Sequence, residues 1–368
     1  MESFVRDLAT AQAAAGDEVL FLGHAPAGQA TSWCDAQNPR LWLARAPWTL
    51  SYAPLAPALS GLFLSALRRF RPEIIHVHAP NPAALWPLLS GTRVPLVVQW
   101  HADVDFPPGR KPWPPLLAAW RGLESRLLAR AGVIAASSPG YPEFSPTLRP
   151  HLSRIRIIPL GLDPERLGVP SDEAVARAKS FWPEQGLRVL AVGRLSHYKG
   201  FEVLLRAMAR VPEASLVLAG EGEERAALES LIGELGLTGR VWLAGGVPDG
   251  LLAGLYAASD LFCLPSLDRA EAFGMVLLEA MHAGRPCLVT DIPGSGPAWV
   301  VRHGETGLVV PPGVVQALGQ ALASLAGDAQ MRARFGQAGK ARFLEQFQIE
   351  AVARKWRETY VDILNAGQ

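Results

Sequence analysis

The sequence has few cysteines and almost no net charge, and each scarcity excludes a class of protein. Its 368 residues include 3 cysteines, at positions 34, 263 and 287, and their wide spacing indicates neither a disulfide framework nor a metal site. The formal net charge of +1 gives no global field that would attract nucleic acid. No secretory signal is recognisable, and no apolar run reaches the roughly 18 residues that a membrane-spanning helix needs. We therefore expect a protein of the reducing cytoplasm that does not bind nucleic acid.

Two chemical motifs are also missing. No G-x-G-x-x-G pattern follows an expected strand, which argues against a nicotinamide-dependent dehydrogenase. No aspartate-rich metal motif is found either, so we expect chemistry that uses no metal and no other cofactor.

Short apolar strands alternate with helical stretches along the chain, a pattern that predicts parallel sheets built from βαβ units. Apolar residues make up 49% of the chain, which is longer than one hydrophobic core usually covers. The segment 161–186 separates two sets of strands, so two Rossmann-like domains are expected. The expected strands are 18–22, 74–78, 96–100, 133–136 and 155–158 in the first set, and 189–192, 215–218, 241–243, 261–264, 287–290 and 308–310 in the second.

Two glutamates, Glu271 and Glu279, flank a Phe-Gly turn in the segment PSLDRAEAFGMVLLEAMHAG, residues 265–284. The apolar run after the turn predicts a helix, with Glu271 just ahead of it and Glu279 on its second turn. The helix start favours a phosphate, and a carboxylate one or two turns further on can accept hydrogen bonds from a ribose diol. The pair therefore predicts a site for a diphosphate-linked sugar. The alternative is two ordinary helix carboxylates, because short motifs also occur by chance.

Two cations, Arg194 and Lys199, lie in the loop GRLSHYKG, between the strand 189–192 and a helical stretch that begins at Phe201. Ligands of open parallel sheets bind at the carboxyl ends of the strands. An arginine with a lysine suits a diphosphate. The loop therefore predicts a second part of the same site, and the alternative is two solvated loop cations.

His101 follows the apolar strand 96–100 directly. Its side chain is therefore expected at the carboxyl end of that strand, facing a cleft between the two domains. Asp103 follows two residues later and could bind a substrate hydroxyl. His76 and His78 lie inside an expected strand, and we interpret them as core histidines.

These segments together resemble the retaining GT-B glycosyltransferases of family 4. The resemblance covers nearly the whole chain, and the segment IPGSGPAWV, residues 292–300, favours a branch similar to bacterial surface-polysaccharide mannosyltransferases, because most of the family has a G-G-x-x-E pattern there. The matching segments in the second half are GRLSHYKG, AGEG, LPS, the glutamate pair and GETGLVV, and those in the first half are RPEIIHVHAPNP, QWHAD, SSPGY and IIPLGLDP.

The resemblance implies an α/β GT-B fold, with two Rossmann-like domains facing each other across a cleft. Residues 1–165 would form the acceptor-side domain, and a C-terminal helix at 350–366 would pack back on it. Residues 166–349 would form the donor domain. The implied activity is transfer of a hexose, with mannose as the expected sugar, from a GDP- or UDP-linked donor to a lipid-linked or nascent polysaccharide such as lipopolysaccharide.

The resemblance also implies a role for each site residue. Arg194 and Lys199 would neutralise the leaving diphosphate, Glu279 would hold the ribose, and Glu271 would bind hydroxyls of the transferred sugar. His101 would orient that sugar, and Asp103 is a possible acceptor-binding residue. The anomeric configuration would be retained in a front-face reaction without a metal, since no carboxylate is placed as an obvious covalent nucleophile. The backbone amides that would add to the diphosphate site belong to Phe273, Gly274, Met275 and Val276.

Other functions stay open at this point. A sugar-nucleotide epimerase or a phosphorylase can share the GT-B architecture, and an N-terminally truncated homologue could bind nucleotide without turnover. The segment 59–71 mixes apolar residues with three arginines, so it could rest on an anionic membrane at the inner face. The alternative for this segment is an amphipathic helix that covers a sheet.

The start of the chain departs from the expected fold. A Rossmann-like domain should open with a buried strand and a glycine-rich turn, yet residues 1–12 already read as a helix. In the resembling family a strand and a Gly-Gly turn precede this helix. We therefore expect the N-terminal domain to lack its first strand, through a start assigned too late or a truncation. The alternative is a shorter domain with unpaired backbone groups in the centre of its sheet.

Overall fold

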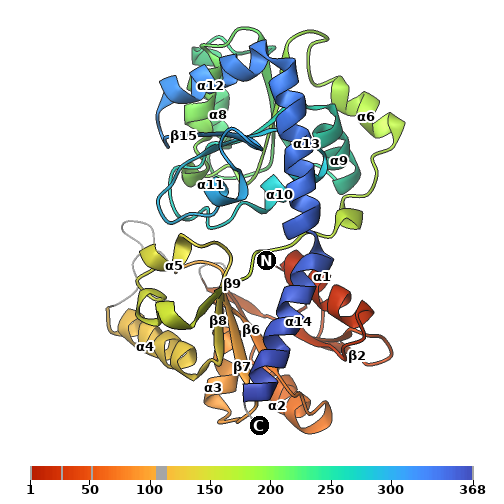
Figure 1. The fold of residues 1–368 in the computed structure, drawn as a ribbon, viewed down its shortest axis with the longest axis vertical. Helices are drawn as coiled ribbons and strands as arrows, with labels where there is room; N and C mark the ends of the chain where they lie inside the picture. The colour runs from red at the N-terminus through yellow and green to blue at the C-terminus, as the bar shows by residue number, and fades with distance from the viewer. Residues whose placement is uncertain (1, 26–27, 51–52, 105–113, 367–368) are drawn as a thin grey trace. The chain divides into compact units, whose positions relative to one another are not determined.

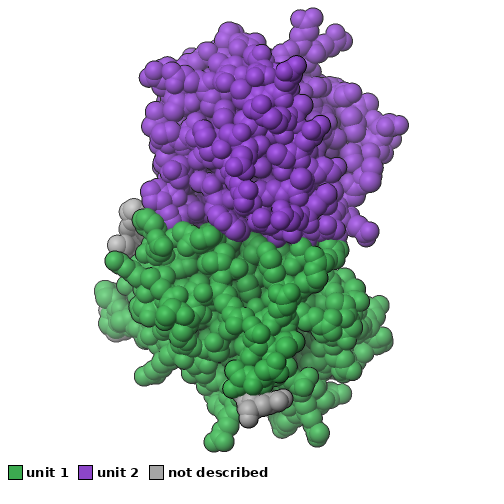
Figure 2. Space-filling view, viewed as in Figure 1, with its two compact units in different colours: residues 1–159, 349–368 green, residues 160–348 purple. Residues whose placement is uncertain are grey.

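A computed structural model of the chain describes residues 2–25, 28–50, 53–104 and 114–366. The chain forms two compact units, shown in green and purple in Figure 2. Unit 1 comprises residues 1–159 and 349–368, and unit 2 comprises residues 160–348. Both units combine parallel strands with helices, as the alternating pattern of the sequence predicts.

Unit 2 is built on a sheet of 6 parallel strands in the order β12-β11-β10-β13-β14-β15. This is the strand order of a doubly wound Rossmann fold, whose topological switch point lies between its first and fourth strands. In unit 2 these strands are β10 and β13, so the fold itself predicts a ligand site at their carboxyl ends. The strands are β10 Leu187–Val192, β11 Ala214–Ala219, β12 Val241–Gly245, β13 Leu261–Leu264, β14 Cys287–Thr290 and β15 Gly307–Val310.

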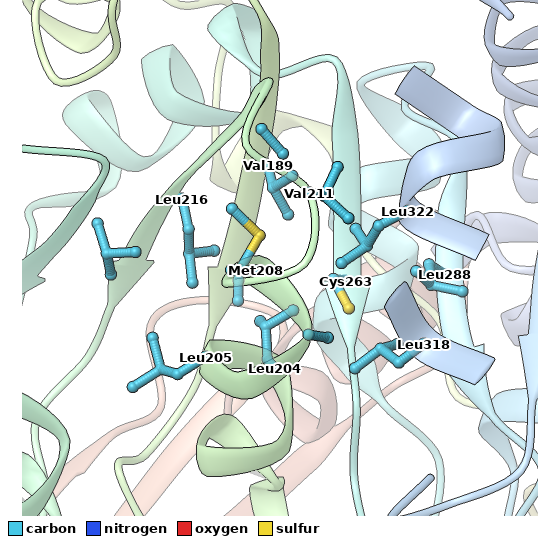
Figure 3. Packing of buried hydrophobic residues seen from close by; sticks show 14 of the residues in the cluster. Val189, Leu204, Leu205, Met208, Val211, Leu216, Cys263, Leu288, Leu318 and Leu322 are labelled. Carbon is cyan, nitrogen blue, oxygen red and sulfur yellow. The ribbon is translucent and has the colours of Figure 1, made fainter. Parts of the chain in front are cut away.

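Helices cover both faces of this sheet. Figure 3 shows Leu204 and Met208 of α7 and Leu322 of α12 pointing into one packed layer with Val189 and Leu216 of the sheet. Each such side chain contributes about 1.5 to 3 kcal/mol when it is fully buried, so this layer holds the carboxyl ends of the strands rigidly. The helices are α6 Asp172–Lys179, α7 Phe201–Met208, α8 Arg225–Glu234, α9 Asp249–Ala258, α10 Met275–His282, α11 Pro297–Val300, α12 Val315–Gly327 and α13 Ala329–Gln346, with short 3-10 turns η3 Pro164–Arg166 and η4 His197–Lys199.

Unit 1 divides its strands between separate sheets. Strands β6-β7-β8-β9 form a 4-stranded parallel sheet, and β1-β3-β2 form a 3-stranded mixed sheet. Within the residues that the structure describes, no strand joins β1 to β6. The strands are β1 Leu20–His24, β2 Ser32–Cys34, β3 Arg40–Ala44, β4 Trp48–Leu50, β5 Ala53–Leu55, β6 Ile75–Ala79, β7 Leu96–Trp100, β8 Val133–Ala136 and β9 Ile155–Ile157.

The last helix of the chain packs in unit 1, where α14 lies beside α1 (Figure 1). Trp356 and Tyr360 of α14 contact His76 of β6, so this helix covers a face of the parallel sheet. Arg357 of α14 also pairs with Asp17, which follows α1. The helices of unit 1 are α1 Glu2–Ala14, α2 Ala58–Arg69, α3 Trp86–Leu89, α4 Pro114–Arg130, α5 Tyr141–Phe144 and α14 Ile349–Ala366, with 3-10 turns η1 Pro82–Leu85 and η2 Arg149–Arg154.

Every strand predicted from the sequence is present, with its ends shifted by a few residues at most. The strands β2 to β5 were not predicted, because they are short and carry no long apolar run. The expected initial helix is α1, although Met1 itself lies outside the described residues. No helix in the described ranges is long and apolar enough to span a bilayer.

Candidate active site

The loops after β10 and β13 are tied together at the switch point of unit 2. The backbone N–H of Leu267 donates to the carbonyl of Tyr198 across 2.8 Å. Gly200 has a φ of +69°, and a Cβ at this position would collide with the carbonyl oxygen of Pro265. The close approach of the two loops therefore requires glycine here.

Lys199 and Glu271 form an ion pair across these two loops. Lys199 Nζ lies 2.6 Å from Glu271 Oε2, and each side chain is only 9% exposed. The hydroxyl of Ser266 donates to the same oxygen at 3.2 Å. An ammonium has three donors, and one of them is used here. The remaining donors make Lys199 a fixed cation for a bound anion, with its position set by Glu271.

Glu279, on the second turn of α10, is buried and holds two further partners. Its Oε1 accepts from Arg166 Nη2 at 2.9 Å, and its Oε2 accepts from the hydroxyl of Tyr256 at 2.8 Å. Burial raises the pKa of this carboxyl, and the Tyr256 hydroxyl and the Arg166 guanidinium oppose that rise. Glu279 is therefore a buried acceptor that neighbouring donors orient.

The turn before α10 is compact. Gly274 has a φ of +85°, and a Cβ there would lie 2.8 Å from Leu277 Cδ1. Phe273 is 3% exposed and packs against Trp299 and Phe347. Met275 and Val276 then open the helix, whose first backbone N–H groups have no partner inside it. An anion at this position would meet these donors and the positive end of the helix dipole.

A cavity of about 330 Å³ lies at the carboxyl ends of β10, β11 and β12. Gly193, Arg194, Glu221 and Val247 are among its lining residues. A Cβ on Gly193 would lie 3.2 Å from the Lys199 side chain, so the lysine and the cavity are immediate neighbours. A larger cavity, of about 530 Å³, lies in unit 1 at the amino ends of β7 and β8, which is not the ligand-binding edge of a parallel sheet.

His101 is buried at the carboxyl end of β7 in unit 1. Its Nε2 lies 3.0 Å from Nδ1 of His78, and the two rings are stacked. The edge of Phe4 on α1 meets both rings. Burial and the neighbouring His78 hold the pKa of His101 well below its usual range, and burial lowers the pKa of His78 to about 3. Both imidazoles are therefore neutral at pH 7.

His76 of β6 forms a hydrogen bond with the last helix of the chain. Gln12 Nε2 donates to the hydroxyl of Tyr360 at 3.0 Å, and that hydroxyl lies 2.8 Å from His76 Nδ1. The hydroxyl of Tyr360 therefore links Gln12 of α1 to His76 of β6. His76 and His78 both contact other side chains, and Nε2 of His76 is buried.

Asp103 is held by three residues of unit 1. Its Oδ1 accepts from Ser145 Oγ at 2.6 Å and from Trp100 Nε1 at 3.2 Å. Its backbone N–H donates to the hydroxyl of Tyr141. Asp103 therefore fixes the loop after β7, a structural role that exists beside the substrate contact expected from the sequence.

The structure brings most of the expected donor-site residues together in unit 2, and their expected roles stay predictions. Lys199 and Glu271 are in contact, and Glu279 lies on the helix that follows. Sequence reasoning missed Tyr256 and Arg166. Tyr256 reads as an ordinary buried aromatic of an apolar helix, and Arg166 lies in a loop far from Glu279 in the chain, so neither carries a local signal.

Comparison with solved structures shows the class of fold. A sucrose-phosphate synthase from Thermosynechococcus elongatus superposes with a TM-score of 0.80 at 25% identity, covering 99% of this chain and 93% of that one. The Anabaena protein HepE, solved with UDP, superposes with a TM-score of 0.72 at 21% identity, covering 94% of this chain and 100% of that one. These likenesses confirm the GT-B fold with Rossmann-like parallel sheets.

Comparison of sequences shows the family. Residues 1–166 match glycosyltransferase family 4, and residues 172–342 match the glycosyl transferases group 1. The D-rhamnosyltransferase WbpZ of Pseudomonas aeruginosa is 33% identical, over 79% of this chain and 75% of the relative. The O-antigen chain mannosyltransferase C of Escherichia coli is 29% identical, over 82% of this chain and 80% of the relative. The chain therefore belongs to glycosyltransferase family 4, and the predicted glycosyltransferase is confirmed.

Proposed function

We propose that this glycosyltransferase moves a hexose from a nucleoside-diphosphate sugar to a hydroxyl of a lipid-linked or nascent polysaccharide, with retention of the anomeric configuration. The observation that carries the proposal is the buried pair of Lys199 and Glu271 at the switch point of the unit 2 sheet. A cation and a carboxylate that meet at this edge, beside the start of α10, suit a ligand that combines a diphosphate with sugar hydroxyls. Unit 2 would then be the donor domain and unit 1 the acceptor-side domain.

Each candidate site residue of unit 2 has a role in this proposal. Lys199 uses its remaining donors, with Arg194, to neutralise the diphosphate as charge develops on the leaving group. The backbone amides from Phe273 to Val276 add to that stabilisation. Glu279 accepts hydrogen bonds from the ribose diol, and Glu271 accepts them from hydroxyls of the transferred sugar.

The residues of unit 1 act on the other partners of the reaction. His101 is neutral at pH 7 because burial lowers its pKa, so it orients the sugar by hydrogen bonding without adding charge. Asp103, whose Oδ1 is held by Ser145 and Trp100, would contact a hydroxyl of the acceptor. In the front-face step the acceptor oxygen bonds the anomeric carbon, the bond to the diphosphate breaks, and the diphosphate takes the acceptor proton.

Mannose carried by GDP is the donor that we propose first. A mannosyltransferase of O-antigen chains is among the relatives, and the segment 292–300 favours the same branch. A panel of GDP- and UDP-linked hexoses, tested by thermal shift, checks this choice, because a ligand stabilises the state that binds it. If only UDP-sugars stabilise the protein, GDP-mannose is not the donor and a UDP-linked hexose is.

The transfer itself is tested by product analysis with and without a lipid-linked glycan acceptor. We expect nucleoside diphosphate and an elongated, retained glycoside only when the acceptor is present. Glu279→Ala should weaken binding of the nucleoside diphosphate by about 10- to 100-fold, through loss of hydrogen bonds to a charged group. An altered sugar nucleotide made without acceptor would indicate an epimerase, and sugar phosphate made from a glycan would indicate a phosphorylase.

Contact with an anionic membrane is a further part of the proposal. The inner face of α2 buries Leu59 and Phe63, while Leu64 is 43% exposed and Arg68 and Arg69 end the helix in solvent. An exposed apolar residue beside cations suits the headgroup region of an anionic bilayer. Co-sedimentation with vesicles that contain phosphatidylglycerol should fall in Arg68→Glu/Arg69→Glu. Equal binding to neutral phosphatidylcholine vesicles would contradict this.

We also propose that a strand and turn complete the sheet of unit 1 between β1 and β6. The support is that both strands lie at sheet edges within the described residues, where a Rossmann-like sheet of the unit 2 type would be continuous. Fusing a strand of five or six apolar residues and a Gly-Gly turn ahead of α1 should raise the melting temperature. The control is a fused strand of the same length with polar residues. If the apolar strand raises the melting temperature no more than this control, the sheet of unit 1 is divided in the native protein.

A further inference from the structure

Tyr256 contacts the proposed ribose carboxylate from a separate helix. Its ring is 1% exposed and packs against Phe262 of β13. Its hydroxyl lies on α9, 2.8 Å from Glu279 Oε2 and 3.3 Å from the carbonyl oxygen of Val276. One hydroxyl proton faces two acceptors, and the closer one is a carboxylate, which forms the stronger hydrogen bond. The proton is therefore donated to Glu279.

This contact selects one orientation of the Glu279 carboxylate. A glutamate side chain rotates about three bonds, and its outer partner, Arg166, is a fork that can take both oxygens of a carboxylate at once. Here Arg166 Nη2 donates to Oε1 while Tyr256 holds Oε2 on the inner side. Each carboxylate oxygen keeps a second lone pair in this arrangement, so both remain able to accept a hydroxyl proton.

We propose that Tyr256 is a positioning residue for nucleotide recognition, which holds Glu279 so that its two oxygens accept the two hydroxyls of a ribose diol. The proposal rests on the role proposed above for Glu279. Without the Tyr256 hydroxyl, Oε2 loses the donor that fixes its direction. The carboxylate can then rotate about its last bond, so that its remaining lone pairs no longer point toward the two hydroxyls of the diol.

The charge state of Glu279 adds a second consequence. Burial raises its pKa and so does Asp249 on α9, whereas Tyr256 and Arg166 oppose the rise. Removing the Tyr256 hydroxyl takes away one stabiliser of the ionised form. The pKa of Glu279 therefore rises further in Tyr256→Phe, and a diol loses its charged acceptor at a higher pH than in the native protein.

The experiment measures how much the ribose hydroxyls contribute to binding. Calorimetry gives the affinity of the native protein and Tyr256→Phe for GDP and UDP, each beside its 2′,3′-dideoxy form. We expect the ratio of ribose to dideoxyribose affinity to fall about tenfold in the variant, which is the size of one lost hydrogen bond to a charged group. The dideoxy nucleotides should bind both proteins within about twofold of each other.

The matched control is Tyr360→Phe, which removes another hydrogen-bonded tyrosine hydroxyl, in unit 1. It should leave the ratio unchanged. A lower folded fraction of Tyr256→Phe would reduce both affinities in the same proportion, so the ratio reports on the diol even if the variant is less stable. The measurement is repeated from pH 5 to pH 8. As the pH falls, the diol contribution to binding should be lost at a higher pH in Tyr256→Phe than in the native protein.

Glu279→Gln separates this inference from the function on which it rests. If the native ratio is large and collapses in Glu279→Gln but not in Tyr256→Phe, the positioning role is wrong and the ribose role of Glu279 stands. If Glu279→Gln leaves the ratio unchanged, the ribose role itself is wrong. An equal loss of ribose and dideoxyribose affinity in Tyr256→Phe would reduce Tyr256 to a structural residue.

Discussion

Units 1 and 2 differ in how completely their buried polar side chains are paired. In unit 2 the buried charges Lys199, Glu271 and Glu279 all have partners before any ligand is bound. In unit 1, by contrast, both amide atoms of Gln99, Nε2 of His76 and Nε1 of Trp356 are buried without a hydrogen-bond partner among the described residues, whereas in the described part of unit 2 this holds for His282 Nδ1 alone. Buried polar groups are normally paired, so this difference needs a physical reason.

The sheets provide that reason. Unit 2 has one continuous sheet whose two faces are covered by helices, and its switch point is intact. The described strands of unit 1 are divided between sheets, and its unpaired groups lie on and around the parallel sheet under α14. The comparison teaches that the unit with one continuous sheet is the one in which the buried charges of the candidate site are paired. We infer that unit 1 is the less stable unit, although it carries His101.

The largest effect that would sharpen this comparison is on turnover. His101→Ala should lower kcat by about 10²-fold, the loss that a misplaced reacting group causes, while nucleoside-diphosphate affinity stays within about twofold. Steady-state kinetics and calorimetry measure the two separately. His151→Ala, also in unit 1, should leave both unchanged. Equal losses of turnover and affinity in His101→Ala would mean that unit 1 contributes to donor binding.

A pH change should affect the two units differently. Burial holds the pKa values of His76, His78 and His101 below 6.5, so unfolded unit 1 binds more protons than folded unit 1 as the pH falls below about 6.5. Above that pH these histidines are neutral in both states, and below it they destabilise the folded state progressively toward pH 3, at about 1.4 kcal/mol per net proton and pH unit.

Glu124 acts in the opposite direction within unit 1. Burial raises its pKa to about 7, so between pH 7 and 4.5 the folded state keeps a proton that the unfolded state lacks. The pKa of His151 is also lowered by burial, so four histidines outweigh one carboxyl. Unit 1 should lose protection from hydrogen exchange between pH 6.5 and 5, after correction for intrinsic rates. Unit 2 should lose less, because the raised pKa of Glu279 favours the folded state as the pH falls and offsets the lowered pKa of His282. A parallel loss in both units would remove the distinction.

Lys199→Ala tests the preformed site of unit 2. Nucleoside-diphosphate affinity should fall by about 10- to 100-fold, because a charge-assisted contact contributes about 1.5 to 3 kcal/mol. Lys179→Ala, on the exposed face of α6, is the control and should bind normally. Because the substitution leaves Glu271 buried without its cation, the melting temperature is measured alongside. Unchanged affinity in a folded Lys199→Ala would show that the diphosphate binds elsewhere.

The smallest effect concerns Gln99. Gln99→Leu removes an unpaired buried amide and should stabilise unit 1 by about 1 to 2 kcal/mol, since the desolvation cost of that amide disappears. Chemical denaturation measures the change. Thr290→Val is the control in unit 2, where the hydroxyl is buried and donates to Ser266, and it should destabilise. Destabilisation by Gln99→Leu would mean that its amide has a partner in solution.

The local elements of the site could be predicted because their signals are contiguous. The apolar run after Gly274 predicts α10, and the strand before Arg194 ends in a loop whose cations face the same edge. The strands β2 to β5 were not predicted, because polar residues and proline interrupt their apolar patterns, although β2 pairs with β3 and β4 with β5 across short connections. The division of the unit 1 strands between sheets depends on pairing between strands that are further apart in the chain.

The sequence by itself determined the alternation of strands and helices, the Phe-Gly turn ahead of α10, and the motifs that mark the family. These properties depend on neighbours within a few residues, where spacing and backbone freedom suffice. Only the tertiary structure decided that Glu271 pairs with Lys199 and that Tyr256 and Arg166 meet at Glu279. A buried charge takes whichever donors the packing of separate helices and loops brings within about 3 Å, and no local pattern of residues encodes that distance.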